Sequence, residues 1–530
     1  MNAHSVGQAV NASPHHGRMA LIEPLLTPRG VVAVWLVYAS VLALLRLLFS
    51  RTLSYHDAIS SAITHGFQFG YQKGQPPLWE WMLAAAQQLL GTGIESHLLV
   101  RYGVIAAVGI GLYRASLAAS GDVRWSAAIS FSVALSYQLG WRHFEGGTQA
   151  LILAAACLFT LDAALRHVEK PNWKSAIYFG LAMGAGFLSK FSFELFMVAL
   201  ALALLIRPAS RRGLLNVWTL LAAGVAIVMV LPYAIWFLQH SVDLGEVVQR
   251  RLVRTDESHV VRVLIGVKNL FVNTPAYLAP WFAVIAGLWW AGRSTRPTVE
   301  AARPAEGILR DTTLIALGIT LAGIVAVGVT RFTVPYLHFI LLPLFPYAAA
   351  LLARSGPAGG PKLLAVTALV AMVVLTSMHI FALAAGSLSA DRISGQHLPY
   401  AALARSIEER GLAKGTIVAF SVRDAGNLHA FLPAAEVLWH ESAERTVTKQ
   451  IVRQRSTCAA IWIDSEAQQT GADADDAKAD DGTAEQHPSL AGRPQETIEA
   501  PLQAIWRRGK RNIRWILVRL DPADSICREG

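Results

Sequence analysis

The residues best suited to chemistry come directly after the first long apolar segment of the chain. Residues 54–57 read Ser-Tyr-His-Asp, and residues 70–79 read Gly-Tyr-Gln-Lys-Gly-Gln-Pro-Pro-Leu-Trp. A carboxylate in a partly dry cleft can take a proton from an attacking hydroxyl, so Asp57 is a candidate general base. Asp is also a favoured N-cap, and Asp57 could simply begin a helix over residues 58–66. The residues alone leave both interpretations open.

The segment 70–79 has the features of a helix start at a membrane surface. Pro is tolerated in the first turn of a helix, so the Pro-Pro pair predicts a helix that carries the following Trp residues. Trp rings prefer the depth of the lipid headgroups. Tyr71, Lys73 and Gln75 precede this helix and could contact a polar headgroup.

Further ionisable residues lie at the ends of other apolar segments, at Glu145, Lys190, His240 and Arg331. Ionisable groups at such a depth usually face a cavity or pair with each other. Lys190 and Arg331 would suit the binding of phosphate oxygens. Plainer alternatives exist for each: an ion pair of Lys190 with Glu194 one turn later, an Arg331 side chain that reaches towards the headgroups, and a His240 that binds carbonyls at a helix end.

The composition is that of a membrane protein. Of 530 residues, 54% are hydrophobic and only 15% are charged, whereas soluble domains carry about a quarter charged residues. Several apolar runs approach the roughly 20 residues that a spanning helix needs. We expect about eleven spans, with thirteen as the upper count, near residues 31–50, 98–119, 126–141, 148–166, 174–189, 192–206, 215–238, 276–292, 312–330, 334–353 and 363–386.

The distribution of Arg and Lys predicts the orientation of these spans. With the N-terminal tail 1–30 in the cytoplasm, the Arg- and Lys-rich short loops all lie inside, as the positive-inside rule requires. This accounts for the net charge of +10 without a nucleic-acid partner, which would need a basic stripe on a soluble domain. The outer loops 51–97 and 239–275 and the turns around Glu145, Lys190 and Arg331 then share one face.

After residue 386 the pattern changes to that of a small α/β domain on the outer side, residues 387–530. Within it, residues 416–420, 459–464 and 513–520 read as strands, and residues 399–410 as an amphipathic helix. The acidic stretch 466–488 reads as a flexible loop, and its spacing does not match a calcium loop.

The three cysteines give no paired metal motif. Cys157 lies in an apolar segment and is expected in the core, whereas Cys458 and Cys527 could pair if the C-terminal region is oxidised. The chain also lacks a phosphate-binding loop, a zinc-protease motif and a nucleophile elbow. No cofactor and no metal site are expected, with a divalent cation left open.

Taken in order, these motifs resemble those of the family 39 membrane glycosyltransferases of the GT-C superfamily, such as the protein O-mannosyltransferases and the aminoarabinose transferase of lipid A. The resemblance rests on an acid after the first span, followed by Gly-Tyr-x-x-x-x-Pro-Pro-Leu-Trp. Residues 180–193 are similar to the Gly-x-x-x-Gly-x-Leu-Ser-Lys segment of the family, and residues 231–240 to its Leu-Pro-x-x-x-Trp-x-x-x-His segment. Residues 416–433 resemble the outer domain of its bacterial members.

The resemblance implies a mainly α, polytopic fold of the GT-C type in the bacterial inner membrane, with a periplasmic α/β domain. It implies transfer of a sugar, with inversion, from a polyprenyl-phosphate donor to a hydroxyl of a glycolipid, glycan or protein acceptor, without nucleic acid. Asp57 would be the base and Glu145 a second acid. The substrate-binding residues would be His56, Tyr71, Lys73, Gln75, Lys190, His240 and Arg331.

Two departures from the family pattern keep other functions open. Many members have Asp-Glu where this chain has His56-Asp57, and some have Lys where it has Gln75, so that phosphate contact would shift to Lys73. A flippase or transporter for the same lipids is one alternative, although a transporter should show internal repeats and broken helices at the midplane. A non-catalytic envelope assembly protein is the other.

Overall fold

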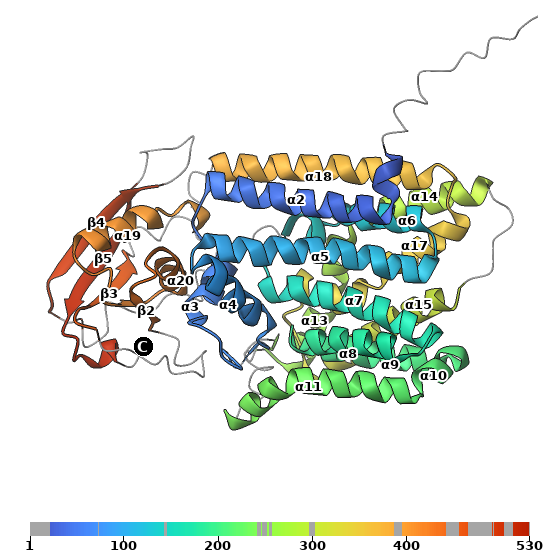
Figure 1. The fold of residues 1–530 in the computed structure, drawn as a ribbon, viewed down its shortest axis with the longest axis horizontal. Helices are drawn as coiled ribbons and strands as arrows, with labels where there is room; N and C mark the ends of the chain where they lie inside the picture. Colours follow the sequence, from blue (N-terminus) through green and yellow to red (C-terminus); the bar gives the residue numbers. More distant parts are fainter. Residues whose placement is uncertain are drawn as a thin grey trace, which may run out of the picture.

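The computed structural model describes residues 22–72, 74–142, 146–240, 245, 252–253, 257–295, 303–385, 395–440, 455–464, 490, 492–502 and 512–528. Within these residues the chain forms a long helical part and a smaller part built on a five-stranded sheet. The long helices run side by side, and the sheet part lies at one end of them (Figure 1).

The helical part consists, in chain order, of η1 (Glu23–Leu26), α2 (Pro28–Phe49), α3 (Tyr55–Ile63), α4 (Leu78–Leu90), α5 (Ile94–Ser120), α6 (Val123–Ser132), η2 (Val133–Leu135), η3 (Tyr137–Trp141), α7 (Thr148–Glu169), α8 (Trp173–Phe187), α9 (Ser192–Ile206), α10 (Pro208–Leu214), α11 (Val217–Gln239), α13 (His259–Leu278), α14 (Trp281–Thr295), α15 (Pro304–Val327), η5 (Val334–Leu337), α16 (His338–Leu341), α17 (Leu344–Ser355) and α18 (Gly360–Ala385). The short helices α3 and α4 lie between the long helices and the sheet (Figure 1).

Helices α2, α11 and α18 lie at the periphery of the helical part and present apolar side chains outwards. Leu44 on α2, Val228 on α11 and Val373 on α18 are all more than half exposed. Soluble proteins rarely expose apolar surface of this extent, whereas lipid tails cover it. By length and composition, six helices among the described residues could cross a membrane, or up to eight if each of two bent pairs is one span. The chain is a multi-pass membrane protein.

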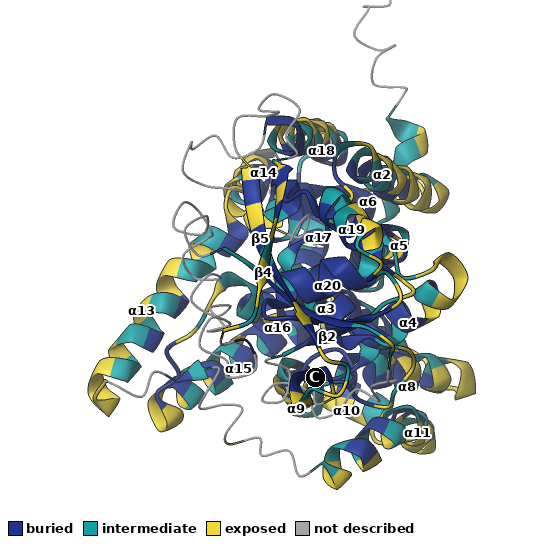
Figure 2. Ribbon diagram, turned by 90° about the vertical axis from the view of Figure 1, so that its left-hand side faces the viewer, coloured by how far each residue is buried: buried dark blue, intermediate teal, exposed yellow. Residues whose placement is uncertain are grey.

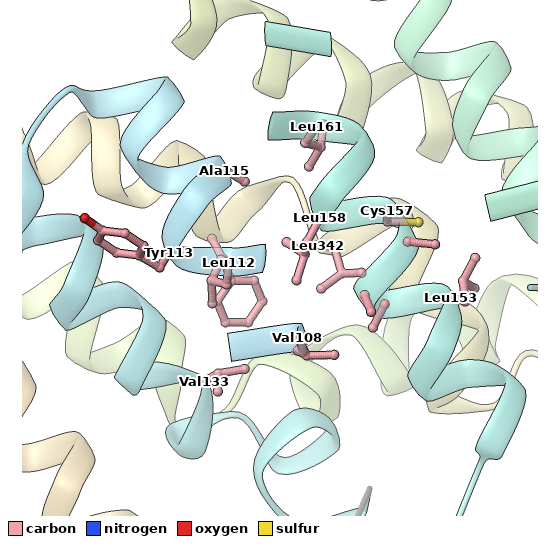
Figure 3. Packing of buried hydrophobic residues seen from close by; sticks show 14 of the residues in the cluster. Val108, Leu112, Tyr113, Ala115, Val133, Leu153, Cys157, Leu158, Leu161 and Leu342 are labelled. Carbon is pink, nitrogen blue, oxygen red and sulfur yellow. The ribbon is translucent and has the colours of Figure 1, made fainter. Parts of the chain in front are cut away.

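The centre of the helical part is the contact between α5 and α7. Leu153, Leu158 and Leu161 of α7 are fully buried and belong to one cluster with Leu112 of α5 and Leu342 (Figure 3). A closely packed apolar core of this kind fixes the position of both helices. It thereby also fixes their first turns, which lie nearest to α3 and α4. Cys157 is buried in the same cluster, as expected.

The expected spans match the helices approximately rather than one to one. The apolar segment 126–141 is not a single helix, because α6 gives way to a 3₁₀ turn and then to a π-helical turn. The expected span 276–292 is divided at the Ala279–Pro280 bond between α13 and α14.

Residues 239–275, which the sequence presents as a loop, contain most of helix α13. Arg262 and Lys268 within it keep its hydropathy below the level of a span. One side of the helix nevertheless packs inwards at helical spacing, with Gly266, Leu270 and Tyr277 buried while Lys268 is exposed. Such periodicity indicates an amphipathic helix.

The sheet part has the strand order β2-β1-β3-β5-β4. Its elements are η6 (Gly395–His397), α19 (Tyr400–Glu409), β1 (Thr416–Ala419), α20 (Val422–Phe431), β2 (Glu436–Trp439), β3 (Cys458–Ile463), β4 (Gln495–Pro501), β5 (Asn512–Leu520) and η10 (Ser525–Cys527). Strand β1 is parallel to β2 and β3, and β5 is antiparallel to both of its neighbours. The three predicted strands and the predicted helix are confirmed. The sequence misses β2, which has four residues, and the polar edge strand β4.

Side chains alternate between the two faces of this sheet, as the strand period requires. Ile417 and Trp515 pack with the helices α19 and α20, whereas Val418 and Leu438 pack on the other face near η10. On that second face Cys458 and Cys527 form a disulfide, with Cα atoms 6.3 Å apart. The acidic stretch 466–488 lies outside the described residues.

Candidate active site

Helix α3 brings Asp57 to the junction of the helical and sheet parts, and Ser54 caps this helix. The Ser54 hydroxyl donates to Asp57 Oδ2 at 2.8 Å, and its oxygen accepts from the Asp57 N–H at 3.4 Å. Asp57 is therefore in the first turn of α3, where the helix dipole favours negative charge. The interpretation of Asp57 as the N-cap of a helix over 58–66 is wrong, because the helix begins at Tyr55.

The Asp57 carboxylate forms a buried ion pair with Arg101 of α5. Arg101 Nη2 lies 2.7 Å from Oδ1, and Arg101 Nε lies 3.3 Å from Oδ2. The Asp57 and Arg101 side chains are only 7% and 1% exposed. Burial by itself would raise the pKa of Asp57, but the Arg101 guanidinium, together with His97 and the Ser54 hydroxyl, holds that pKa below its usual value. Asp57 is therefore ionised at neutral pH.

Arg101 connects Asp57 to two further segments. Its Nη1 donates to the Gly146 carbonyl oxygen at 3.2 Å. Its guanidinium carbon lies 5.9 Å from the centroid of the Trp79 ring, within the range of a cation–π contact. A single guanidinium thus contacts α3, the start of α4 and the chain that leads into α7, so the position of each depends on the others.

His56 precedes Asp57 and is half-buried. Burial, together with the cations Arg101, Lys190 and Arg142, lowers the pKa of its imidazole to about 4, while Asp57 acts in the opposite direction. His56 is therefore neutral at pH 7. Among the described residues that act on His56, three cations face one carboxylate, and the resulting net positive charge suits an anionic group such as a phosphate.

The Gly-Tyr…Pro-Pro-Leu-Trp segment is held from two sides. A Cβ atom on Gly70 would lie 2.3 Å from the Trp236 ring, so only glycine fits against α11 here. At the other end of the segment, the Leu78 N–H donates to the Leu188 carbonyl oxygen at 2.9 Å. Leu188 lies two residues before Lys190, so three of the motifs meet at one place.

Tyr71 and Gln75 fit a binding role to different degrees. Tyr71 is 1% exposed, and its hydroxyl donates to the Gly66 carbonyl at 2.7 Å and accepts from the Gln68 N–H at 3.1 Å. Tyr71 thus anchors the loop. Gln75 is half-buried and pairs with Gln72 in an isolated β-bridge. Its side-chain oxygen has no hydrogen-bond partner among the described residues, so it remains available to a ligand.

Lys190 lies in the turn before α9, beside the Asp57 cluster. Its Nζ is 4.3 Å from the centroid of the Tyr336 ring, and it is close enough to His56 to lower the pKa of that imidazole. Arg331, five residues before Tyr336, is exposed. The hydrogen bonds of the Asp57 carboxylate go to Ser54 and Arg101, so Arg331 is not its ion-pair partner.

His240 follows the end of α11 and takes the plainer of its two predicted roles. Its Nδ1 lies 2.7 Å from the Trp236 carbonyl oxygen, and its ring stacks on that of Trp236 with centroids 4.5 Å apart. The imidazole thus binds a carbonyl oxygen of the last turn of α11. It also supports the Trp236 ring that packs against Gly70.

Helix α20 of the sheet part packs directly on α3, and Figure 2 shows both helices buried at the centre of the end view. A Cβ atom on Gly426 would lie 2.0 Å from the Ala58 carbonyl oxygen, so glycine is required for this approach. The Ser61 hydroxyl donates to the Gly426 carbonyl at 2.8 Å, and Asn427 Oδ1 accepts from the Leu53 N–H at 2.8 Å. The sheet part therefore fixes the helix that carries Asp57.

Three buried ionisable residues of this region are not predicted from the sequence, namely Arg101, His97 and Glu80. An Arg near the start of an apolar segment does signal a buried partner, and His97 lies one turn before it on the same face. Glu80 gives a weak signal, because an acid in the first turn of a helix is ordinary. The identity of the partners is not readable from the sequence, since 44 residues separate Asp57 from Arg101.

Two predicted residues, Lys73 and Glu145, lie outside the described residues. Among the residues that the structure does describe, no group of three or more His, Cys, Asp or Glu side chains could hold a metal ion.

Comparison with known proteins connects this geometry to a family. Residues 74–236 match the family described as "Dolichyl-phosphate-mannose-protein mannosyltransferase". The chain is 25% identical over 434 residues to the lipopolysaccharide core galacturonosyltransferase RgtB of Rhizobium johnstonii, covering 79% of this chain and 84% of that protein. It is 29% identical over 194 residues to the lipopolysaccharide core galacturonosyltransferase RgtA of the same organism, covering 36% and 38% of the two chains.

The fold is also that of a solved structure. The crystal structure of ArnT from Cupriavidus metallidurans bound to undecaprenyl phosphate matches with a TM-score of 0.52 and 15% identity, over 94% of this chain and 98% of that one. The apo structure of the same protein matches with a TM-score of 0.52 and 16% identity, over 97% and 99%. The chain is thus similar in sequence to lipopolysaccharide core galacturonosyltransferases, matches the mannosyltransferase family over residues 74–236, and has the fold of ArnT.

Proposed function

We propose that the protein transfers a sugar from a polyprenyl-phosphate donor to a hydroxyl of the lipopolysaccharide core, with Asp57 as the base. The observation that carries the proposal is the buried Asp57–Arg101 ion pair, which lies where the motif segments meet. Two relatives with matching sequences are lipopolysaccharide core galacturonosyltransferases. A structural neighbour binds undecaprenyl phosphate, which supports a carrier of this kind.

In the proposed reaction the acceptor hydroxyl oxygen attacks the anomeric carbon of the donor sugar, and its proton passes to Asp57. The bond between the anomeric carbon and the phosphate oxygen breaks, so polyprenyl phosphate leaves and the configuration inverts. Asp57 would exchange the longer of its Arg101 contacts, 3.3 Å at Oδ2, for the acceptor hydroxyl. Active-site hydrogen bonds often rearrange in this way when substrate binds.

The cations near His56 would stabilise the leaving phosphate. Charge develops on that group as the glycosidic bond breaks, and fixed cations in a site of low dielectric lower the energy of the transition state. Lys190 is the cation that we assign to this contact, with Gln75 as a neighbouring hydrogen-bonding group. Lys73, Arg331 and Glu145 remain predicted contributors. The same positive charge would suit a sugar that carries its own carboxylate, such as galacturonate.

We place this reaction at the periplasmic face of the bacterial inner membrane. The Arg- and Lys-rich short loops support a cytoplasmic N-terminal tail, so that the loops 51–97 and 239–275 and the domain 387–530 would face the periplasm. The disulfide in the sheet part agrees with an oxidising compartment.

Deletion of the gene is expected to remove one sugar from the cell envelope. The test is mass spectrometry of lipid A, core oligosaccharide and surface polysaccharide from cells with and without the gene. We expect the core oligosaccharide to lose the mass of one hexuronate residue and to regain it when the gene is restored. Identical glycan masses in the two strains would contradict the proposal.

A further inference from the structure

A second buried carboxyl group, Glu80, follows the Trp79 ring that contacts Arg101, and the proposed mechanism does not use it. Glu80 is in the first turn of α4 and is 1% exposed. The residue before it, Trp79, contacts Arg101, and Leu78 is hydrogen-bonded to the turn that carries Lys190. Glu80 therefore belongs to a helix whose start is held both by Arg101 and by the turn that carries Lys190.

The two carboxyl oxygens of Glu80 differ in their hydrogen bonding. Oε1 accepts from Gln149 Nε2 at 2.9 Å and, more weakly, from Gln72 Nε2 at 3.5 Å. Oε2 is buried and has no hydrogen-bond partner among the described residues. Buried polar atoms are nearly always paired, because an unpaired one forfeits its hydration without compensation. An unpaired carboxyl oxygen in this position is one that a ligand can satisfy.

Among the described residues, the side chains that act on Glu80 are polar and uncharged. The side chains of Gln72 and Gln149, whose amides donate to the carboxyl group, are half-buried. The hydroxyl groups of Tyr71 and Tyr233 are close enough to interact with it electrostatically. The Tyr233 hydroxyl also has no hydrogen-bond partner in the described part of the chain.

Burial raises the pKa of Glu80 to about 7, and the hydrogen bonds from Gln72 and Gln149 only partly oppose this. Near neutral pH the group therefore exists in both forms, and it can accept or donate a hydrogen bond. Convergent amide, hydroxyl and carboxyl groups of this kind orient small polar ligands.

We propose that Glu80, with Gln72 and Gln149, forms a subsite that binds a hydroxyl group of one of the two saccharide substrates. This inference rests on the proposed function, because it presupposes that a glycosyl group is bound next to Asp57. The subsite would select for the hydroxyl, since a substrate without it leaves a buried carboxyl oxygen unpaired. The donor sugar and the terminal acceptor sugar offer the same chemistry, so the test must separate them.

The test compares the binding of three purified ligands to the whole protein in lipid nanodiscs. The ligands are undecaprenyl phosphate, undecaprenyl phosphate galacturonate and lipid A carrying the truncated core. The variants are E80M, the isosteric E80Q and, as a matched control, E95Q, which alters an exposed carboxyl paired with Arg51. Thermal unfolding verifies that each variant is folded. If E80M does not fold, the comparison is made with E80Q.

We expect E80M to bind one sugar-bearing ligand about tenfold more weakly or worse, with E80Q intermediate and E95Q unchanged. Binding of sugar-free undecaprenyl phosphate should not change. A loss on the galacturonate lipid assigns the subsite to the donor, and a loss on the core glycolipid assigns it to the acceptor.

Unchanged affinity of folded E80M for both sugar-bearing ligands would overturn the subsite alone. An equal loss on the sugar-free carrier would also overturn it, because a purely structural role predicts that result. If the wild-type protein binds neither sugar-bearing ligand more tightly than sugar-free undecaprenyl phosphate, the proposed function is overturned, and the subsite with it.

Discussion

Replacing Asp57 by Asn is expected to abolish sugar transfer. Because the change also leaves the buried Arg101 guanidinium without its anionic partner, some loss of stability is expected, and transfer is compared at equal amounts of folded protein in the membrane. The amide keeps the shape of the side chain and its hydrogen bond to Ser54 but cannot take a proton from the acceptor hydroxyl. Loss of a general base typically costs a factor of about 10² to 10⁴ in rate. The measurement is the recovery of the glycan in a deletion strain that expresses the variant, with protein level determined in isolated membranes.

A matched control for this variant is Asp162→Asn. Asp162 is as buried as Asp57 and is paired with Arg114 and Arg166. Arg114 lies 13 residues beyond Arg101 on α5, which is about 20 Å along a helix. Asp162→Asn therefore removes another buried carboxylate charge far from the site, although its Arg partners are 41% and 42% exposed, and we expect transfer to survive it. If Asp57→Asn keeps more than half of the wild-type activity, Asp57 is not the base.

Replacing Arg101 by Met is expected to destabilise the protein by about 3–5 kcal/mol, because it leaves the Asp57 carboxylate buried and unpaired. The measurement is the free energy of unfolding in detergent micelles. The double variant D57N/R101M removes both charges, and we expect it to be more stable than R101M alone. A double variant no more stable than R101M would show that the unpaired charge is not the cause.

The free energy of unfolding of R101M is expected to depend on pH, in a direction set by the pKa of Asp57. In the wild type, Arg101 holds the pKa of Asp57 below its usual value. The pair therefore contributes stability above the ordinary Asp pKa near 4 and loses it as the pH falls through the lower folded-state value. Without Arg101, burial raises that pKa instead, so R101M gains stability on acidification. We expect the stability difference between R101M and wild type to narrow from pH 7 towards pH 5.

The sequence predicts the architecture well because lipid imposes a simple rule on it. A spanning helix must satisfy its backbone internally and must be apolar outside, and α2, α7 and α18 follow that pattern. Helix α13 does not follow that pattern. Its charged residues lower its hydropathy to that of a loop, although one of its faces packs against the rest of the helical part. The distribution of Arg and Lys among the short loops likewise predicts that Asp57 and Lys190 lie on one face, and in the structure both act on the pKa of His56.

The partners of the candidate base are not predictable in the same way. Arg101 and Glu80 reach the site through tertiary packing of α4 and α5, and no local pattern records those distances. The docking of Gly426 on Ala58 also depends on a contact across more than 360 residues. What the sequence supplies is a set of ionisable residues that need partners, and only the fold decides how they are paired.

The most direct test of the central claim is transfer by the purified protein in nanodiscs. The reaction contains undecaprenyl phosphate galacturonate and lipid A carrying the truncated core, and mass spectrometry follows both. We predict that the acceptor gains the mass of one hexuronate residue while sugar-free undecaprenyl phosphate accumulates in equal amount, and that D57N shows neither change. An acceptor of unchanged mass in the presence of bound donor, or a D57N protein as active as wild type, would contradict the account.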